Sequence, residues 1–121
     1  MTRNRASAKA AGSAMETLTT TYLAEHIADH IERRVTNGAM DRGDISGLRH
    51  MGGRVVVEVK NYGGRLEAST WVNEAEIERG NDDALAGVVV AKRRGTTDPG
   101  EQFVLMTLAD LVALLTGVRP E

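Results

Sequence analysis

The 121-residue chain contains no cysteine, which excludes disulfide bonds and metal sites built on thiolates. Aromatic residues make up only 3% of the sequence, so the core must be built from aliphatic side chains. No apolar run approaches the roughly 20 residues that cross a bilayer. The basic first 14 residues lack the apolar segment of a signal peptide. We therefore expect one domain in a reducing, cytoplasmic setting, without a membrane partner.

The formal net charge of -2 does not by itself indicate nucleic-acid binding. An acidic catalytic site can lower the net charge, however, while basic residues gather elsewhere. Two basic groups stand out, one near the start and one after a predicted strand: Arg3, Arg5, Lys9, Lys92, Arg93 and Arg94. Both groups could contact phosphate or simply be solvated. We expect residues 1–12 to form a flexible basic arm and residues 13–121 a single domain.

The segment from Val55 to Val59 is the clearest predicted strand, because β-branched residues dominate it and Gly52 and Gly53 precede it. Alternation places Val55, Val57 and Val59 on one face, which can fill a core. It places Val56, Glu58 and Lys60 on the other face. The carboxylate of Glu58 and the amine of Lys60 are therefore expected about 7 Å apart along the strand.

Asp44 opens a shorter extended segment, residues 45–49. If Met51, Gly52 and Gly53 turn the chain back as a hairpin, Asp44 returns near Glu58. Two carboxylates and a lysine at one end of a sheet would suit a hard divalent cation. The alternative is structural, with Glu58 and Lys60 as an exposed pair and Asp44 as a turn residue.

A first helix is predicted over residues 14–35, capped by Ser13 and ended by Asn37 and Gly38. Its periodicity turns Glu16 inward, where a carboxylate needs a partner. The helix dipole offers a weaker explanation for an acid in the first turn. His26 and His30, four residues apart, could bind a metal, although surface positions are the simpler interpretation.

The rest of the chain predicts a helix, two strands and a helix. The loop 61–67 carries Arg65, and the helix that Ser69 or Thr70 caps, to about residue 85, carries Glu74 as a second site candidate. Trp71 serves packing or contacts a ligand. Residues 88–91 are predicted to form a strand that is buried on both faces. Residues 102–106 are predicted to form a further strand. The helix 108–116 is apolar nearly all round, which suggests a subunit interface. The fold class is α/β, a small mixed sheet flanked by helices.

At the level of motifs, Asp44 followed by Glu58-Val59-Lys60 resembles the Asp...Glu-x-Lys signature of the PD-(D/E)XK nuclease superfamily. The segment Gly12-Ser13-Ala14-Met15-Glu16 resembles the Gly-Ser-x-x-Glu opening of archaeal-type Holliday junction resolvases. Residues 87–94 are similar to the strand that follows that family's second helix. The resemblance spans about residues 12–106. It departs from the family at Gly43, where a proline is usual, and at Glu74, where several members carry glutamine.

The resemblance implies a restriction-endonuclease-like core that cleaves DNA with Mg²⁺ or Mn²⁺. Asp44, Glu58 and the Val59 carbonyl would bind the metal, and Glu16 a second metal or a metal-bound water. Lys60 would orient or help activate the attacking water. DNA contacts would come from the following residues: Arg3, Arg5, Lys9, Ser13, Arg65, Lys92, Arg93 and Arg94.

A junction resolvase implies a homodimer acting on four-way junctions, because two strands are cut symmetrically. A phage-encoded relative would act in the host cytoplasm. Two alternatives share the residues: another repair or restriction-type nuclease of the superfamily, and a non-catalytic DNA-binding or assembly module. A small-molecule enzyme finds no support, since nucleotide-loop and nucleophile motifs are absent from the sequence.

Overall fold

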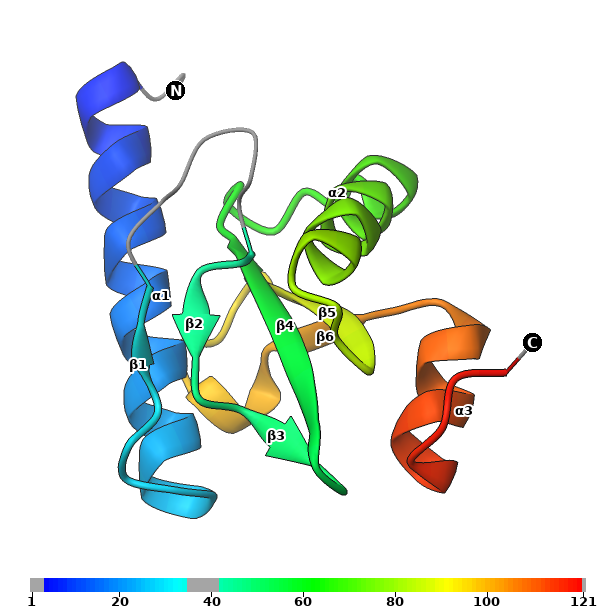
Figure 1. Ribbon diagram of the computed structural model, residues 1–121. Coiled ribbons are helices and arrows are strands. Elements are labelled where there is room, and N and C mark those ends of the chain that lie inside the picture. Colours follow the sequence, from blue (N-terminus) through cyan, green and yellow to red (C-terminus); the bar gives the residue numbers. More distant parts are fainter. Residues whose placement is uncertain (1–3, 35–41, 121) are drawn as a thin grey trace.

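The computed structural model describes residues 4–34 and 42–120. It is an α/β structure in which helices flank one mixed sheet (Figure 1). The elements follow in this order: α1 (Arg5–His26), β1 (Glu32–Arg33), β2 (Ile45–Ser46), β3 (Arg49–His50), β4 (Gly53–Lys60), α2 (Ala68–Asn81), β5 (Ala86–Ala91), the 3₁₀ helix η2 (Pro99–Glu101), β6 (Phe103–Leu105) and α3 (Leu108–Thr116).

The sheet order is β1-β2-β4-β5-β6, with β3 paired to the start of β4. The strands β1, β2 and β4 are antiparallel neighbours, and Ile45 of β2 lies opposite Val57 of β4. The pairing changes to parallel between β4 and β5, where Glu58 lies opposite Val89. A parallel pair needs a crossover connection, and α2 provides it. The predicted small mixed sheet is therefore confirmed.

Both faces of β4 are covered. Val55, Val57 and Val59 pack with Met15 of α1 in one cluster, which confirms the predicted core face. On the opposite face, Trp71 of α2 packs with a separate set of residues: Ala75, Val89 and Ala91. Trp71 is only 2% exposed, so it serves packing and the predicted ligand contact is wrong. The strand β5 is buried along both faces, as its continuous apolar run predicts.

The first helix begins and ends earlier than the sequence predicts. Asn4, not Ser13, is the N-cap, and its side chain accepts a hydrogen bond from the Ser7 N–H at 2.8 Å. Residues 5–12, predicted to be a flexible arm, are the first turns of α1. Their alanines favour helix even without an apolar stripe. The predicted stop at residues 37–38 lies outside the described residues.

After α1 ends at His26, the chain turns back and buries Ile31 in the core beside β4. Burial of this apolar side chain favours the early end of the helix. The two histidines therefore do not share a helix face, which contradicts a helical metal pair. The His26 ring lies 4.3 Å from that of Tyr22, and His30 Nε2 lies 3.1 Å from the Gly47 carbonyl oxygen.

The last helix follows the sequence closely. Thr107 caps α3 by accepting a hydrogen bond from the Asp110 N–H at 3.1 Å, and Gly117 ends it in the left-handed conformation. Ala113 faces the molecule, whereas Leu108 and Leu115 are each 76% exposed. The predicted helix 69–85 is α2, but its N-cap is Glu67 and makes no side-chain cap bond. Among the described residues, no helix has the length and apolar character needed to span a bilayer.

The close approach of α2 to β5 predicts a stability effect at Gly87. A Cβ there would lie 2.8 Å from the Ala75 carbonyl oxygen, so Gly87→Ala must push the helix off the sheet. We expect a loss of about 1–3 kcal/mol in urea denaturation. Gly80→Ala is the matched control on α2, because nothing lies within 4 Å of its Cβ, and it should stabilise by up to about 1 kcal/mol. Equal stabilities for the two variants would contradict this packing.

Candidate functional site

The backbone brings Asp44 back to the end of β4, as the hairpin prediction requires. The Asp44 N–H donates to the Val57 carbonyl oxygen at 2.8 Å. Its carboxylate Oδ2 accepts a hydrogen bond from the Val59 N–H at 2.7 Å. Glu58 lies near enough to this carboxyl to act on it by charge and by a side-chain hydrogen bond. Two carboxylates therefore meet at one end of the sheet.

Glu58 lies on the face of β4 that α2 covers, and it is only 8% exposed. Its Oε2 atom is buried and has no hydrogen-bond partner among the described residues. A second buried acid, Glu78 of α2, is close enough to act on it by charge and hydrogen bonding. A buried carboxylate with an unmatched oxygen costs free energy unless a proton or a cation compensates it.

The pKa values of both carboxyls reflect this crowding. Burial, followed by the neighbouring charge of Glu58, raises the pKa of Asp44 from 3.8 to about 7. Burial, followed by the hydrogen bond and charge of Glu78, raises the pKa of Glu58 from 4.5 to about 9. Groups with strongly raised pKa values that converge at one place are typical of functional sites.

Lys60 supplies the positive charge of the site. Its Nζ lies 2.7 Å from Glu74 Oε2 and 3.7 Å from Glu58 Oε1. Burial opposes the charged form, but the pairing with Glu74 and Glu58 outweighs it, so the pKa of Lys60 lies above 10.5. Lys60 is therefore a cation at neutral pH. Glu74 holds this lysine rather than completing a set of carboxylates.

Glu16 does turn toward the sheet from α1, and its partner is Arg33 of β1. Glu16 Oε2 lies 2.6 Å from Arg33 Nη2, which also donates to Ser13 Oγ at 3.0 Å. A carboxylate that faces inward requires a partner, and Arg33 is the partner of Glu16. Glu16 still lies near enough to Asp44 for its charge to raise the pKa of that carboxyl.

The residues present fit a hard divalent cation. The raised pKa values show that the ionised form of each carboxyl is poorly compensated, and one Glu58 oxygen has no partner among the described residues, so a bound cation could replace the proton and pair with the carboxylates. Carboxylate and carbonyl oxygens are the ligands that Mg²⁺ and Mn²⁺ prefer. Within residues 4–34 and 42–120, no three acidic or histidine side chains already surround one point as metal ligands. Asp44, Glu58 and the Val59 carbonyl would therefore hold a cation together with water.

Glu78 is the site residue that the sequence analysis missed. The buried positions of α2 are Trp71, Ala75 and Glu78, and the buried Asp82 follows at its C-cap. Their spacing of four, three and four residues is that of one helix face. The signal was therefore present, because Trp71 identifies the buried face and Glu78 lies on it two turns later.

Several residues predicted to contact DNA gather at the same end of the molecule. The Lys92 N–H donates to the Lys60 carbonyl oxygen at 2.9 Å, so the basic segment after β5 begins beside the site. Arg94 packs against Gly64, next to Arg65, which joins this segment to the loop after β4. The Arg93 guanidinium lies 5.2 Å from the centre of the Phe103 ring.

The N-terminal half of α1 extends past the same end of the sheet (Figure 1). Asn61 Nδ2 donates to the Ala11 carbonyl oxygen at 3.4 Å and ties the helix to the loop after β4. Arg5 and Lys9 are exposed on these turns, whereas Ser13 is already bonded to Arg33. Arg3 lies outside the described residues.

Comparisons with protein-family models, with curated proteins and with solved structures found no significant match.

The raised pKa values predict how stability depends on pH. Because the folded-state pKa values of Asp44 and Glu58 exceed 3.8 and 4.5, the folded protein binds protons more tightly. Their stabilising contribution is complete below about pH 4 and is lost as pH rises through about 7 and about 9. In EDTA, Asp44→Asn and Glu58→Gln should therefore be more stable than wild type at pH 8.5, by at least about 1 kcal/mol.

Urea denaturation at several pH values measures this difference, which should shrink toward pH 5. Glu25→Gln is the matched control, because Glu25 is exposed on α1 and should show no such trend. Variants less stable than wild type at pH 8.5 would mean that the carboxylates are already well compensated.

Proposed function

We propose that the protein is a Mg²⁺- or Mn²⁺-dependent DNA endonuclease with a restriction-endonuclease-like core. The observation that carries this proposal is the meeting of Asp44, Glu58 and Lys60 at the end of β4. The two acids are separated in sequence, and the protein leaves the ionised form of each poorly compensated. The order of helix, antiparallel strands, helix and parallel strand supports the resemblance to the superfamily.

The side chains have distinct roles in this proposal. Asp44, Glu58 and the Val59 carbonyl hold the cation, which when bound lowers the pKa of water and polarises the phosphate. The hydrogen bond from the Val59 N–H fixes one oxygen of Asp44. Glu16, which pairs with Arg33, would bind a second cation or a water molecule.

Lys60 acts as a positioned cation. Because its pKa is raised, it keeps its proton at neutral pH and does not take one from water. It orients the attacking water by donating a hydrogen bond and neutralises charge that develops on the phosphate. Glu74 fixes the direction of the amine through their 2.7 Å contact. Attack in line on phosphorus would leave a 5′-phosphate and a 3′-hydroxyl.

The substrate we propose is a four-way DNA junction, cut by a homodimer. Symmetric cleavage needs two sites related by a two-fold axis. The exposed face of α3 offers an apolar surface for that contact, made by these residues: Leu108, Leu111, Val112 and Leu115. Apolar patches of this kind on a surface mark interaction sites.

Cleavage of junction, nicked and linear DNA with Mg²⁺ tests the catalytic assignment. Asp44→Asn and Glu58→Gln should lose at least about a hundredfold in rate, because each removes a ligand charge. Lys60→Ala should lose a similar factor. Glu74→Gln should lose less, because it only loosens the lysine.

Arg65→Gln controls for a general loss of DNA binding, since Arg65 is exposed and pairs with Glu67 at 3.2 Å. Calorimetric Mn²⁺ binding separates the alternatives. If wild type binds DNA but does not bind Mn²⁺ and does not cleave, the protein is instead a non-catalytic DNA-binding module. Full activity in both Asp44→Asn and Lys60→Ala would refute the nuclease site.

Sedimentation equilibrium tests the dimer. Wild type should be dimeric at micromolar concentration, and Leu108→Lys with Leu115→Lys should make it monomeric by placing charges in the contact. Ile77→Lys is the matched control, because Ile77 is 64% exposed and belongs to α2, not to the apolar face of α3. A monomeric wild type would count against junction resolution and leave the other superfamily nucleases.

A further inference from the structure

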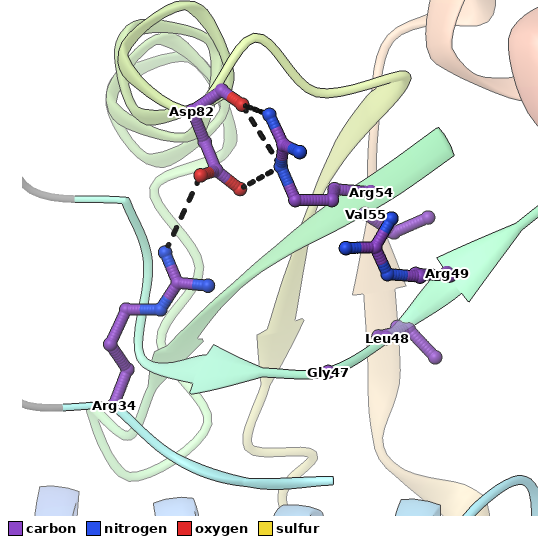
Figure 2. A pocket seen from close by; sticks show the side chains of 7 residues that line it. All are labelled: Arg34, Gly47, Leu48, Arg49, Arg54, Val55 and Asp82. Carbon is purple, nitrogen blue, oxygen red and sulfur yellow. Dashed lines mark hydrogen bonds and ion pairs between the residues drawn. The ribbon is translucent and has the colours of Figure 1, made fainter. Parts of the chain in front are cut away.

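A second group of charges lies beside the carboxylates and has no role in the proposed chemistry. A cavity of about 110 Å³ is lined by Arg34, Arg49, Arg54 and Asp82, and it adjoins a hollow of about 520 Å³ that Arg42 also lines. Either volume exceeds the roughly 30 Å³ of one water molecule. Figure 2 shows Arg34, which directly follows β1, and Arg54 of β4 reaching the same aspartate. We call these four arginines and Asp82 the arginine pocket.

Asp82 explains part of this gathering. Its side chain is only 5% exposed, and it is the C-cap of α2, where the helix dipole disfavours a negative charge. Arg54 compensates it most closely, with Nε 3.3 Å from Oδ2 and further bonds to the Asp82 carbonyl oxygen. Arg34 and Arg42 each place Nη1 3.7 Å from Oδ1. One carboxylate is therefore surrounded by three guanidinium groups.

The positive charge exceeds what Asp82 needs. Even with the exposed Asp83 counted, four arginines face two aspartates among the described residues that line the cavity and the adjoining hollow. The guanidinium of Arg49 has no hydrogen bond or ion pair with any described residue, and Figure 2 draws none for it. A guanidinium carries five N–H donors in a fork that matches phosphate oxygens. The pocket therefore presents surplus charge and donors in a hollow that can admit an anion.

The arginine pocket adjoins the candidate metal site. The Arg34 N–H donates to the Asp44 carbonyl oxygen at 2.7 Å, so Arg34 is the neighbour of Asp44 across the sheet. Asp82 follows Glu78 by one helical turn, about 6 Å. Arg54 and Glu58 share a face of β4 and lie about 13 Å apart along the strand. At about 3.4 Å per nucleotide, a bound strand could span this distance in about four steps.

We propose that the arginine pocket binds a backbone phosphate of the DNA strand a few nucleotides from the cleaved bond. The proposal rests on the proposed function, because the ligand is a phosphate of the same substrate. The contact is independent of sequence, since phosphates are identical along the strand. It positions the substrate and adds to affinity without touching the reacting phosphate.

DNA binding over a series of salt concentrations in EDTA tests the proposal without cleavage. The double variant Arg42→Gln with Arg49→Gln removes two charges but leaves Arg34 and Arg54 to compensate Asp82. It should bind every sequence more weakly, and the slope of log affinity against log salt should fall by about one, because the contact with one phosphate is lost. Arg42→Lys with Arg49→Lys is the matched control and should keep the slope, because both charges remain.

Titration with inorganic phosphate, followed through the arginine Nε–H signals in NMR, is the second readout. Saturable shifts at Arg34, Arg49 and Arg54 are expected. Shifts without any change of salt slope in the glutamine variant would assign the pocket to a free phosphate ligand and overturn the DNA contact. If neither the salt slope nor the arginine Nε–H signals change, the proposal is refuted. The pocket is then only a network of ion pairs around Asp82.

These outcomes separate the pocket from the nuclease site. Pocket-dependent DNA binding by a protein that does not cleave with Mg²⁺ would refute the proposed activity and leave the pocket standing. If cleavage depends on Asp44 but the salt slope is unchanged when Arg42 and Arg49 are replaced by glutamine, only the phosphate contact of the pocket is refuted. Wild type that binds neither DNA nor phosphate would refute both.

Discussion

The structure depends on one strand that is covered on both faces. Because α1 packs on one side of β4 and α2 on the other, no side chain of its central part reaches bulk water freely. Valine satisfies this constraint, but Glu58 and Lys60 do not, and each must find a charged neighbour. Lys60 pairs closely with Glu74, whereas Glu58 shares Lys60 at the longer distance of 3.7 Å and lies beside two further acids, Asp44 and Glu78. The candidate site is therefore the place where the constraint is met least well.

Those features whose signals are local could be predicted from the sequence. The valines at alternate positions identify the core face of β4, the apolar run identifies β5, and Thr107 with Gly117 bounds α3. The return of Asp44 to Glu58 also followed, because a hairpin fixes which residues face each other. In each case the information lies within a few residues, so the three-dimensional context changes little.

What could not be predicted depends on partners distant in sequence. Nothing around Glu16 indicates that Arg33 is its counter-ion, because that requires β1 to run beside α1. The start of α1 was missed because helix propensity, without an apolar stripe, was enough to form its first turns. The arginines around Asp82 come from three separate segments, and only the assembled sheet brings them to one helix end.

The acidic face of α2 also fixes how that helix lies along the strand. Three acids of α2 and its C-cap lie beside three charged residues of β4. Glu74 pairs with Lys60, Glu78 lies beside Glu58, and Asp82 pairs with Arg54. Sliding α2 by one turn, about 6 Å, would move Glu78 toward Lys60, which lies about 7 Å from Glu58 along the strand, and would remove the like-charged contact. The ion pairs Glu74–Lys60 and Asp82–Arg54 oppose that slide. They therefore hold α2 in the position that keeps Glu78 beside Glu58. The strain of the carboxylate site is thus maintained by the ion pairs on either side of it.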